Sequence, residues 1–311
     1  MKRFDGSHRV PATLPHPVVA LGNFDGVHRA HQTLIEHTRA IARKLKGTSV
    51  VYTFHPHPAA ILAPDAAPLL LQTLDQRLET FEACGIDATV VEPFTTEFAA
   101  KRALDFFENI IVGRLHAAAL VVGYDFTFGH KREGTVKELE AWARKHGLQS
   151  DILPAQFSGE ELISSTQIRR LIAAGGVQHA ALLLGRAHEL VGTVIPGHGR
   201  GKGLGAPTAN INPNTMLIPG DGVYVTTTLL PNGKKVNSIT NVGTNPTFGD
   251  DVRMVETHLL EGGENVVGTT IRVAFLERLR DEKTFKNPQE LAAQIARDIE
   301  EARRRHGRRA S

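Results

Sequence analysis

The sequence predicts an α/β domain with a mostly parallel sheet, followed by a small antiparallel β-barrel domain with a C-terminal helix. Three observations support this fold class. Strand-like apolar runs alternate with helical patterns as far as Leu153, short strands between turn signals follow Gly185, and a well-signalled helix begins after Asn287. At roughly 100–200 residues per domain, a length of 311 residues also fits two domains. We expect them to span residues 1–184 and 185–311.

The elements of the first half follow from residue type and spacing. Val18–Leu21 is a short apolar run, and apolar residues recur at helical spacing within Leu34–Leu45. The other predicted strands are Ser49–Phe54, Ala88–Val91, Ala119–Val122 and Ser150–Leu153. The other predicted helices are Asp75–Cys84, Lys101–Leu115 and Val136–His146. Ligands of parallel sheets bind beyond the carboxyl ends of the strands, so we expect the chemistry in the loops after Leu21, Phe54 and Val122.

The second half has a different pattern, in which turn signals such as Pro231-Asn232-Gly233 separate short strand candidates. These candidates are Val191–Ile195, Gly222–Leu229, Lys235–Val242, Met254–Leu260 and Thr269–Phe275. The last helix has Asn287 as its N-cap, Pro288 at its first position and Glu290 at its third. This arrangement is typical of a small antiparallel barrel closed by a helix.

Composition excludes several classes of protein. Hydrophobic residues make up 41% and charged residues 22%, which is ordinary for a globular domain and unlike a disordered chain. The longest apolar runs, such as Ala117–Val122, are too short to cross a membrane, and no secretory signal precedes the first prolines. A single cysteine, Cys84, fits a reducing compartment. We therefore expect a cytoplasmic protein without a membrane partner.

The charge pattern argues against a nucleic-acid partner, although the isoelectric point is about 9.0. The 36 basic and 33 acidic residues give a net charge of only +3. Five of the arginines lie in the terminal stretch Arg303–Arg309, and without them 31 basic residues face 33 acidic ones. We interpret the basic tail, from about Arg303, as a frayed and solvated helix end. Nothing in the sequence sets the oligomeric state.

The densest motif is the segment Gly22–His31, with the sequence GNFDGVHRAH, between the first strand and the first helix. Its glycines, Gly22 and Gly26, allow a tight turn and a close approach of the backbone to a ligand. The helix N-terminus offers free N–H groups to phosphate. His28 and His31 are three residues apart and can stabilise charge on leaving phosphates. The alternative is a helix start with two surface histidines.

A second motif, Ile163–Arg169, with the sequence ISSTQIR, leads a helix that ends near Gly175. Its hydroxyl groups can act as an ordinary helix N-cap. They can also form a second phosphate cradle together with the fixed cation of Arg169.

These two motifs together resemble the nucleotidyltransferases with His-x-Gly-His and Ser-Ser-Thr-x-Ile-Arg motifs, and more narrowly the adenylyltransferase module of the bacterial bifunctional riboflavin kinase/FAD synthetases. Ala30 stands where that family usually has glycine. The resemblance implies a Rossmann-like nucleotidyltransferase domain that transfers AMP from ATP to FMN and gives FAD. It assigns the following residues to the ATP phosphates and the transition state: Gly22, Phe24, Asp25, Gly26, His28, His31, Ser165, Thr166 and Arg169.

Other segments of the first half carry the same resemblance. Phe54–Pro58 is similar to the family's Phe-x-Pro-His-Pro segment, Pro93–Ala99 to its flavin-side loop, and Val122–Gly129 to its Val-Gly-x-Asp/Asn-Phe-x-Phe-Gly segment. The resemblance implies contacts with the flavin or nucleotide for Pro56, His57, Asp125 and Phe128.

The second half contains a stretch, residues 197–205, in which every second residue is glycine, followed by Pro207-Thr208-Ala209-Asn210. The stretch itself is consistent with a flexible surface loop or with a flap over phosphates. Thr208 and Asn210 lie two residues apart on an extended chain and so face the same way. Their oxygens can ligate Mg²⁺ together with a nucleotide phosphate.

This block resembles the riboflavin kinase module, although Ala206 replaces the large apolar residue often found there. The resemblance places Gly199 and Lys202 at the ATP phosphates. It continues through Asp221–Tyr224, Asn241–Phe248 and Val255–Leu259, and covers roughly residues 16–304. By this resemblance Glu256 is the catalytic base, which accepts the proton of the riboflavin 5′-hydroxyl as that group attacks ATP.

The sequence therefore predicts a bifunctional enzyme that converts riboflavin to FMN in the second domain and FMN to FAD in the first. Its substrates are riboflavin, FMN and ATP, and its cation is Mg²⁺. One alternative is an enzyme with a single active module, which only Ala30 and Ala206 favour. Another is a flavin-binding regulator or a nucleic-acid binder. Such a binder would need no catalytic base, so Glu256, the two histidines and Arg169 speak against it.

Overall fold

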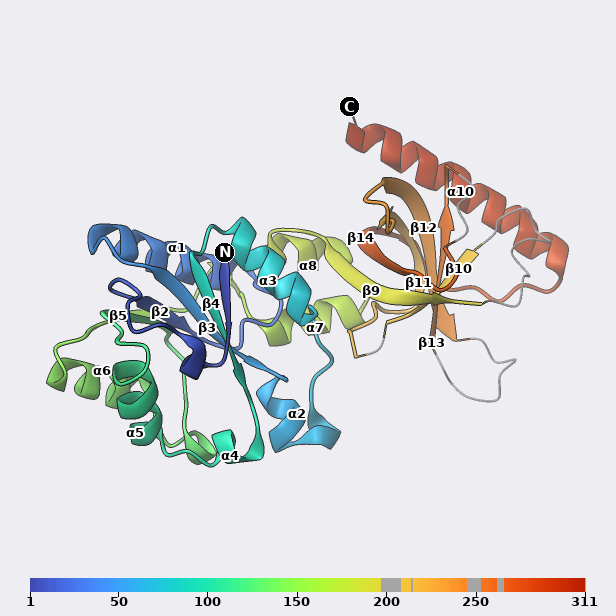
Figure 1. Cartoon of the computed structure of the whole chain (residues 1–311). Coiled ribbons are helices and arrows are strands. Elements are labelled where there is room, and N and C mark those ends of the chain that lie inside the picture. Colours follow the sequence, from blue (N-terminus) through green and yellow to red (C-terminus); the bar gives the residue numbers. More distant parts are fainter. Residues whose placement is uncertain (197–207, 214, 245–252, 262–265, 311) are drawn as a thin grey trace. The chain divides into compact units, whose positions relative to one another are not determined.

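The computed structural model describes residues 1–196, 208–213, 215–244, 253–261 and 266–310 (Figure 1). They form two compact units. The first comprises Met1–Pro68 and Leu74–Ser164, and the second comprises Leu69–Thr73 and Ser165–Ser311. The second unit thus includes the helices before Gly185, whereas the predicted division at 184/185 follows the change in sequence pattern. The boundary between the functional modules stays a prediction.

The first unit is built on a six-stranded sheet whose paired strands are all parallel. Its strands are β1 (Lys2–Asp5), β2 (Val18–Leu21), β3 (Ser49–His55), β4 (Ala88–Pro93), β5 (Ala119–Gly123) and β6 (Gln149–Leu153). Their order in the sheet is β1-β4-β3-β2-β5-β6. The predicted α/β fold is confirmed. The edge strand β1 was not predicted, because it has no apolar run and only extends the sheet beside β4.

Helices and short turns connect these strands. The helices are α1 (Arg29–Lys44), α2 (Pro58–Leu62), α3 (Leu74–Ala83), α4 (Thr96–Ala99), α5 (Ala103–Phe106) and α6 (Val136–Lys145). A small hairpin, β7 (Phe157–Ser158) and β8 (Glu161–Leu162), follows β6. The predicted helix Lys101–Leu115 is wrong in detail, because α5 passes into a π-helix at Phe107–Val112. The wider π turn accompanies the burial of adjacent pairs such as Ile110 and Ile111.

Alternate residues of each strand bury two separate layers. Val18 and Ala20 of β2 belong to a core that includes Leu34 and Ile35 of α1 and Phe81 of α3. The intervening strand residues join a second core with α5, the π-helix and α6. Both faces of the sheet are therefore covered, as the near-continuous apolar strands require.

The strand order places a topological switch at β2. The chain runs from β2 outward through β3 to β4, and then returns to the other side of β2 with β5. Such a switch point leaves a crevice at the carboxyl ends of the strands, where ligands of open α/β sheets bind. The loop Gly22–His28 leaves β2 at this edge.

The second unit contains a closed barrel with the strand order β10-β13-β12-β11-β14-β9. Its strands are β9 (His188–Ile195), β10 (Thr208–Asn212), β11 (Gly222–Leu229), β12 (Lys235–Thr244), β13 (Arg253–Leu259) and β14 (Thr270–Arg280). The helices of this unit are α7 (Ser165–Ala173), α8 (Val177–Leu184) and α10 (Pro288–Ala310). The predicted antiparallel barrel with a C-terminal helix is confirmed.

The barrel interior is mixed in character. Aromatic and aliphatic side chains such as Tyr224, Val255 and Phe275 fill most of it. A ladder of fully buried hydroxyl groups runs across β11, β12 and β13. It consists of Thr226, Thr228, Ser238, Thr240 and Thr257, linked by contacts of 2.8–2.9 Å. Each hydroxyl satisfies a neighbour, so this polar row is tolerated in the core.

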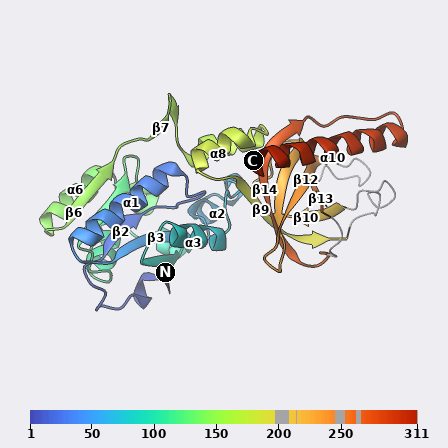
Figure 2. The ribbon, with the colours of Figure 1, turned by 90° about the horizontal axis from the view of Figure 1, so that it is seen from above.

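Helix α10 lies along the outside of the barrel (Figure 1, Figure 2). Its start is capped as predicted, because Asn287 Oδ1 accepts a hydrogen bond from the Glu290 backbone at 2.8 Å. Ile299 and Ala302 pack on the outer face of β11 and β12. Arg280 of β14 and Asp298 of α10 form a largely buried ion pair at 2.7 Å, which fixes the middle of the helix.

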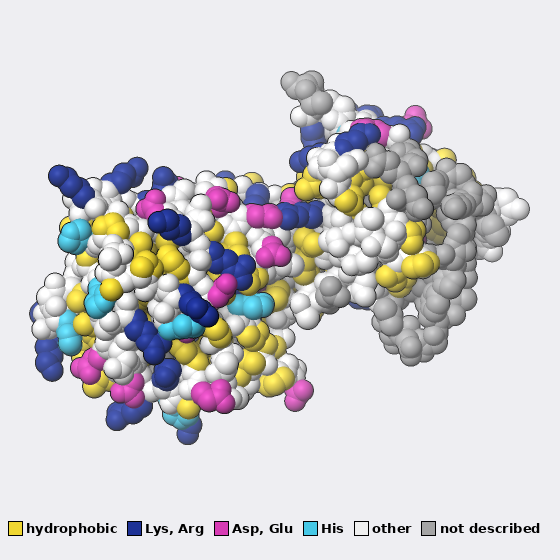
Figure 3. All heavy atoms as spheres, viewed as in Figure 1, with side chains coloured by type: hydrophobic (Ala, Val, Ile, Leu, Met, Phe, Trp, Pro, Cys, Tyr) yellow, Lys and Arg dark blue, Asp and Glu magenta, His cyan; other side chains and the backbone are white. Residues whose placement is uncertain are grey.

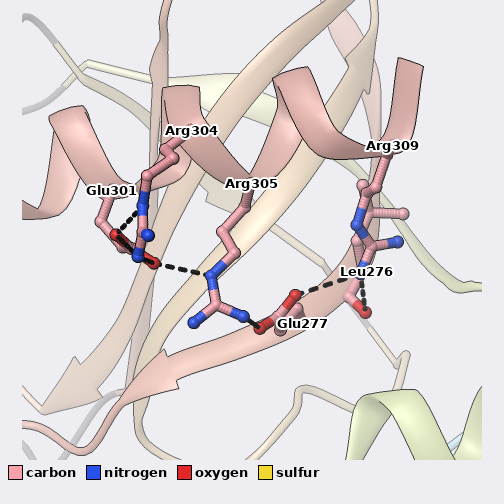
Figure 4. Close-up of polar contacts among 6 residues, drawn as sticks. All are labelled: Leu276, Glu277, Glu301, Arg304, Arg305 and Arg309. Atoms are coloured by element: carbon pink, nitrogen blue, oxygen red, sulfur yellow. Dashed lines mark hydrogen bonds and ion pairs between the residues drawn. The ribbon is translucent and has the colours of Figure 1, made fainter. Parts of the chain in front are cut away.

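The expectation of a frayed tail is wrong, although most of its arginine side chains are exposed as predicted. Helix α10 continues to Ala310, and its arginines reach acidic side chains (Figure 4). Arg305 bonds Glu277 of β14 as well as Glu301, and Arg309 bonds Glu277 at 3.2 Å. The reason is helical spacing: positions four apart face the same strand, so one acidic residue of β14 receives two arginines.

His306 supports the same conclusion, since it is 8% exposed and its Nε2 lies 3.3 Å from the Ser238 carbonyl oxygen.

On the face shown in Figure 3, Lys and Arg side chains alternate with Asp and Glu over the first unit, in agreement with a body of low net charge. Among the described residues, no helix is both long and apolar enough to cross a membrane.

These contacts predict that Glu277→Gln loosens the last turns of α10, because Arg305 and Arg309 lose a shared anion. Trypsin should then cleave the helix end faster than in the parent chain. The matched control is Glu300→Gln, whose exposed side chain makes no ion pair with the described residues. Equal cleavage of Glu277→Gln and the parent chain would contradict the docking.

Acid should have a similar effect. Hydrogen bonds from Arg305 and Arg304 lower the pKa of Glu301. A carboxyl group whose pKa is lowered by folding stabilises the folded helix above its ordinary pKa of about 4.3, and that stabilisation is lost as the pH falls through the lowered value. The rate at which an acid-active protease cleaves the end of α10, measured across a pH series, should rise as the pH falls through the lowered pKa of Glu301. An unchanged rate would contradict this role of Glu301.

Candidate functional site

The two histidines of the first motif form a stacked pair at the start of α1. His28 is the N-cap, and its Nδ1 accepts a hydrogen bond from the His31 backbone at 3.4 Å. The ring centroids are 3.6 Å apart and the ring planes differ by 15°. The two rings therefore lie on one side of the helix start, where the backbone potential favours phosphate.

The backbone before this pair turns sharply. Phe24 and Val27 have positive φ angles of 52° and 35°, and Gly26 has one of 84°. The Phe24 ring is 1% exposed and lies in the core, 5.1 Å from the His31 ring and at 85° to Phe81. Any contact of Phe24 with a nucleotide is therefore made by its backbone. A Cβ at Gly22 would lie 3.1 Å from the Phe24 ring, so Gly22 makes room for it.

Asp25 in the same loop is 3% exposed, so its carboxylate is not at the surface. A buried cation accompanies it: Arg77 of α3 is 5% exposed. Burial lowers the pKa of the Arg77 guanidinium, and the negative charge of Asp25 opposes that shift. Sequence reasoning missed Arg77, because its position in a helix gives no sign that the side chain points toward the strand ends.

The loop after β3 contains two of the predicted flavin contacts. Pro56 is exposed, and His57 is the half-buried N-cap of α2, whose Nδ1 accepts from the Ala59 backbone at 3.2 Å. Burial lowers the pKa of the neighbouring His55, and the positive charge of Arg77 lowers it further.

The other two predicted contacts lie in the loop after β5 and differ in exposure. Asp125 is exposed and free to meet a ligand. Phe128 instead is 9% exposed and joins the core, with its ring stacked on Phe126 at 5.4 Å. Phe128 thus supports Phe126, which is only half buried.

The second motif opens α7 in the second unit. Ser165 and Thr166 are its first two residues, and Ile168 is fully buried. Arg169 donates from Nε to the Leu69 carbonyl oxygen at 2.9 Å, which fixes the base of its guanidinium. The motif is therefore a helix start, as predicted.

The predicted kinase residues meet in the barrel. β10 and β13 are antiparallel, and Asn210 lies directly opposite Glu256, while Thr208 lies opposite His258. On its other side Glu256 pairs with Asn241 of β12. Residues directly opposite each other share a face, with Cβ atoms about 4.5–5.5 Å apart. The three strands thus form one polar row on the outer face of the barrel.

This row has the donors that a small, hard cation prefers. Thr208 is exposed and Asn210 is 4% exposed. The Oδ1 atom of Asn210 is buried and has no hydrogen-bond partner among the described residues. An unsatisfied buried acceptor is unfavourable, and a cation or a donor from a substrate would satisfy it. The residues present therefore fit Mg²⁺.

Among the described residues, no group of three or more His, Cys, Asp or Glu side chains could hold a metal alone. A cation here would need substrate phosphate oxygens as further ligands, as Mg²⁺ commonly does. Gly199 and Lys202, predicted at the phosphates, lie outside the described residues. Asn241 was not predicted as a site residue, although its place across from Glu256 follows once the strand register is known.

Comparisons with known proteins identify the family of each half of the chain. A family model described as FAD synthetase matches residues 10–167, and one described as riboflavin kinase matches residues 184–306. The bifunctional riboflavin kinase/FMN adenylyltransferase of Haemophilus influenzae is 33% identical over 303 residues, covering 97% of this chain and 98% of its own. The Escherichia coli K12 protein of the same name is 34% identical over 299 residues, covering 96% of each chain.

A solved structure is similar over the same length. The Streptococcus pneumoniae protein, named a macrolide-efflux protein, has a TM-score of 0.86 and 30% identity, covering 97% of this chain and 98% of its own. The two family models follow the order that the motifs predicted, and the named relatives span nearly the whole chain. The chain therefore belongs to the bifunctional riboflavin kinase/FMN adenylyltransferase family, with a FAD synthetase module followed by a riboflavin kinase module.

Proposed function

We propose that the two ATP-dependent reactions of this family, formation of FMN and formation of FAD, are performed by the two groups of residues described above. The observation that carries the proposal is the pairing of Asn210 with Glu256 across two strands, because the sequence assigned both to the kinase reaction from separate motifs. The stacked pair of His28 and His31 gives the same support to adenylyl transfer.

In adenylyl transfer, a phosphate oxygen of FMN attacks the α-phosphorus of ATP, and the bond to the bridging oxygen breaks so that pyrophosphate leaves. No covalent enzyme intermediate is needed, so positioning and charge stabilisation supply the rate enhancement. We assign His28, His31 and the start of α1 to the phosphates of ATP. Ser165, Thr166 and Arg169 would hold the triphosphate, and Asp125 and His57 would lie near the flavin or nucleotide.

In the kinase reaction, the 5′-hydroxyl of riboflavin attacks the γ-phosphorus of ATP and ADP leaves. We assign the acceptance of the hydroxyl proton to the Glu256 carboxylate, which is half buried beside Asn210 and Asn241. Thr208 and Asn210 would hold Mg²⁺ against the nucleotide, and the cation would neutralise charge on the polyphosphate. The single cysteine suits a cytoplasmic location.

His28→Ala should reduce FAD formation from supplied FMN and ATP by about 10²-fold or more, because a donor to the developing phosphate charge is lost. FMN formation from riboflavin should be unchanged in the same preparation. His37→Ala, a half-buried histidine further along α1 that pairs with Asp151, serves as the control. FAD formation at the parent rate in His28→Ala would refute the assignment.

Glu256→Gln should reduce FMN formation by about 10²–10⁴-fold, since the amide cannot accept the hydroxyl proton. Formation of FAD from supplied FMN should be retained. Glu261→Gln, an exposed carboxylate beyond the end of β13, is the matched control. Separate chromatographic assays for FMN and FAD measure both steps, and undiminished FMN formation in Glu256→Gln would exclude Glu256 as the base.

Asn210→Ala should increase the Mg²⁺ concentration needed for half-maximal FMN formation, because it removes a buried oxygen ligand. Asn212→Ala on the same strand is the control, since that side chain is exposed. The check is a Mg²⁺ titration of the kinase reaction at fixed ATP. Identical titration curves for Asn210→Ala and the parent chain would argue against Asn210 as a ligand.

A further inference from the structure

Arg77 is a buried cation with no role in either reaction as assigned. Its Nη1 atom donates to the Asn23 carbonyl oxygen at 2.7 Å and to Thr53 Oγ1 at 3.2 Å. Its Nη2 atom donates to the Phe54 carbonyl oxygen at 3.2 Å. All three acceptors belong to the carboxyl ends of β2 and β3 or to the residues that follow.

The energetics indicate that this contact is specific. A buried guanidinium is unfavourable unless it is paired and hydrogen-bonded. Here the three acceptors and the nearby Asp25 carboxylate satisfy it, although burial still lowers its pKa. An apolar side chain of similar length would fill the same space without the cost of removing a charge from water. Packing alone therefore does not account for an arginine at this position.

The acceptors connect the two loops to which adenylyl transfer is assigned. Asn23 is an exposed residue at the start of the loop that leads to His28. Phe54 lies two residues before Pro56 and three before His57. The planar fork of arginine can hold two carbonyl oxygens at a fixed separation, which the point charge of lysine does not.

We propose that Arg77 is a positioning residue for adenylyl transfer, whose guanidinium holds the loop of His28 and His31 in register with the loop of Pro56 and His57. This inference rests on the proposed function of those loops. Arg77 acts through them and is not assigned a contact with substrate.

The fold itself has other supports at this place. Hydrogen bonds of the parallel ladder join β2 and β3 from Val18 to Leu21, and Phe81 anchors α3 in the core. Thr53 Oγ1 also donates to the Asn23 carbonyl oxygen, at 3.1 Å. Loss of Arg77 should therefore disturb the loops more than the sheet beneath them.

The test uses the full chain with Arg77→Ala and Arg77→Lys. FAD formation from supplied FMN should fall by about 10²-fold in Arg77→Ala, mainly in kcat, because a misplacement near 1 Å has effects of that size. Arg77→Lys should be intermediate, since it keeps a cation and loses the fork. FMN formation by the second unit is an internal control for the amount of intact chain and should not change, and a thermal unfolding curve like that of the parent chain shows that the first unit of each variant is folded.

Two further measurements separate positioning from stability. Guanidinium chloride at low millimolar concentration should restore part of the FAD formation of Arg77→Ala, whereas ammonium chloride should not, because only guanidinium reproduces the fork. Thr53→Val should reduce FAD formation less than Arg77→Ala. The double variant should fall by less than the product of the single effects, since both groups act on one carbonyl oxygen.

Arg114→Ala is the control for loss of an arginine elsewhere in this unit, where the guanidinium contacts Ser7. FAD formation that survives Arg77→Ala but not His28→Ala would overturn this inference alone. An equal loss of FAD and FMN formation, or a loss without guanidinium rescue, would also overturn it. FAD formation that survives His28→Ala would overturn the proposed function and this inference together.

Discussion

Strand register is the constraint on which both candidate sites depend. In the first unit, β2 pairs in parallel with β3 and β5, so the loops that follow these strands leave at one edge of the sheet. In the barrel, antiparallel pairing sets Asn210 opposite Glu256. A slip of one residue would turn Glu256 toward the interior, where Val255 and Thr257 now lie buried, and the polar row would be lost. The chemistry is thus carried by side chains, but their meeting is decided by backbone hydrogen bonds.

Local signals predicted much of the fold because they act over a few residues. Val18–Leu21 and Gly222–Leu229 have the predicted bounds, since apolar runs and turn residues define them without help from distant parts of the chain. The Asn287 cap was equally predictable, because it depends on Glu290 only three residues away. The motif with His28 and His31 also assembled locally, since the N-cap hydrogen bond from the His31 backbone to the His28 ring spans only three residues.

The features that could not be predicted depend on partners far along the chain. The guanidinium of Arg77 donates hydrogen bonds to Asn23, Thr53 and Phe54. No pattern within α3 predicts these partners. The arginine-rich end of α10 was misjudged for the same reason, because Glu277 lies on another strand. Most of these positive charges are used within the molecule. The positive potential that attracts phosphate is therefore expected from helix N-termini and from single side chains. The high isoelectric point comes mainly from arginines that attach α10 to the barrel.

The hydroxyl ladder inside the barrel has an evolutionary consequence. Thr226, Ser238, Thr240 and Thr257 are joined by contacts in which either oxygen can be the donor, and Thr228 donates to Ser238. Replacing one of these residues by valine would leave the hydroxyl group of its neighbour without a hydrogen-bond partner in an apolar interior. We therefore expect these positions to change together among relatives. A relative would keep all the hydroxyl groups or replace several of them by hydrocarbon side chains, and a replacement of one alone would be rare.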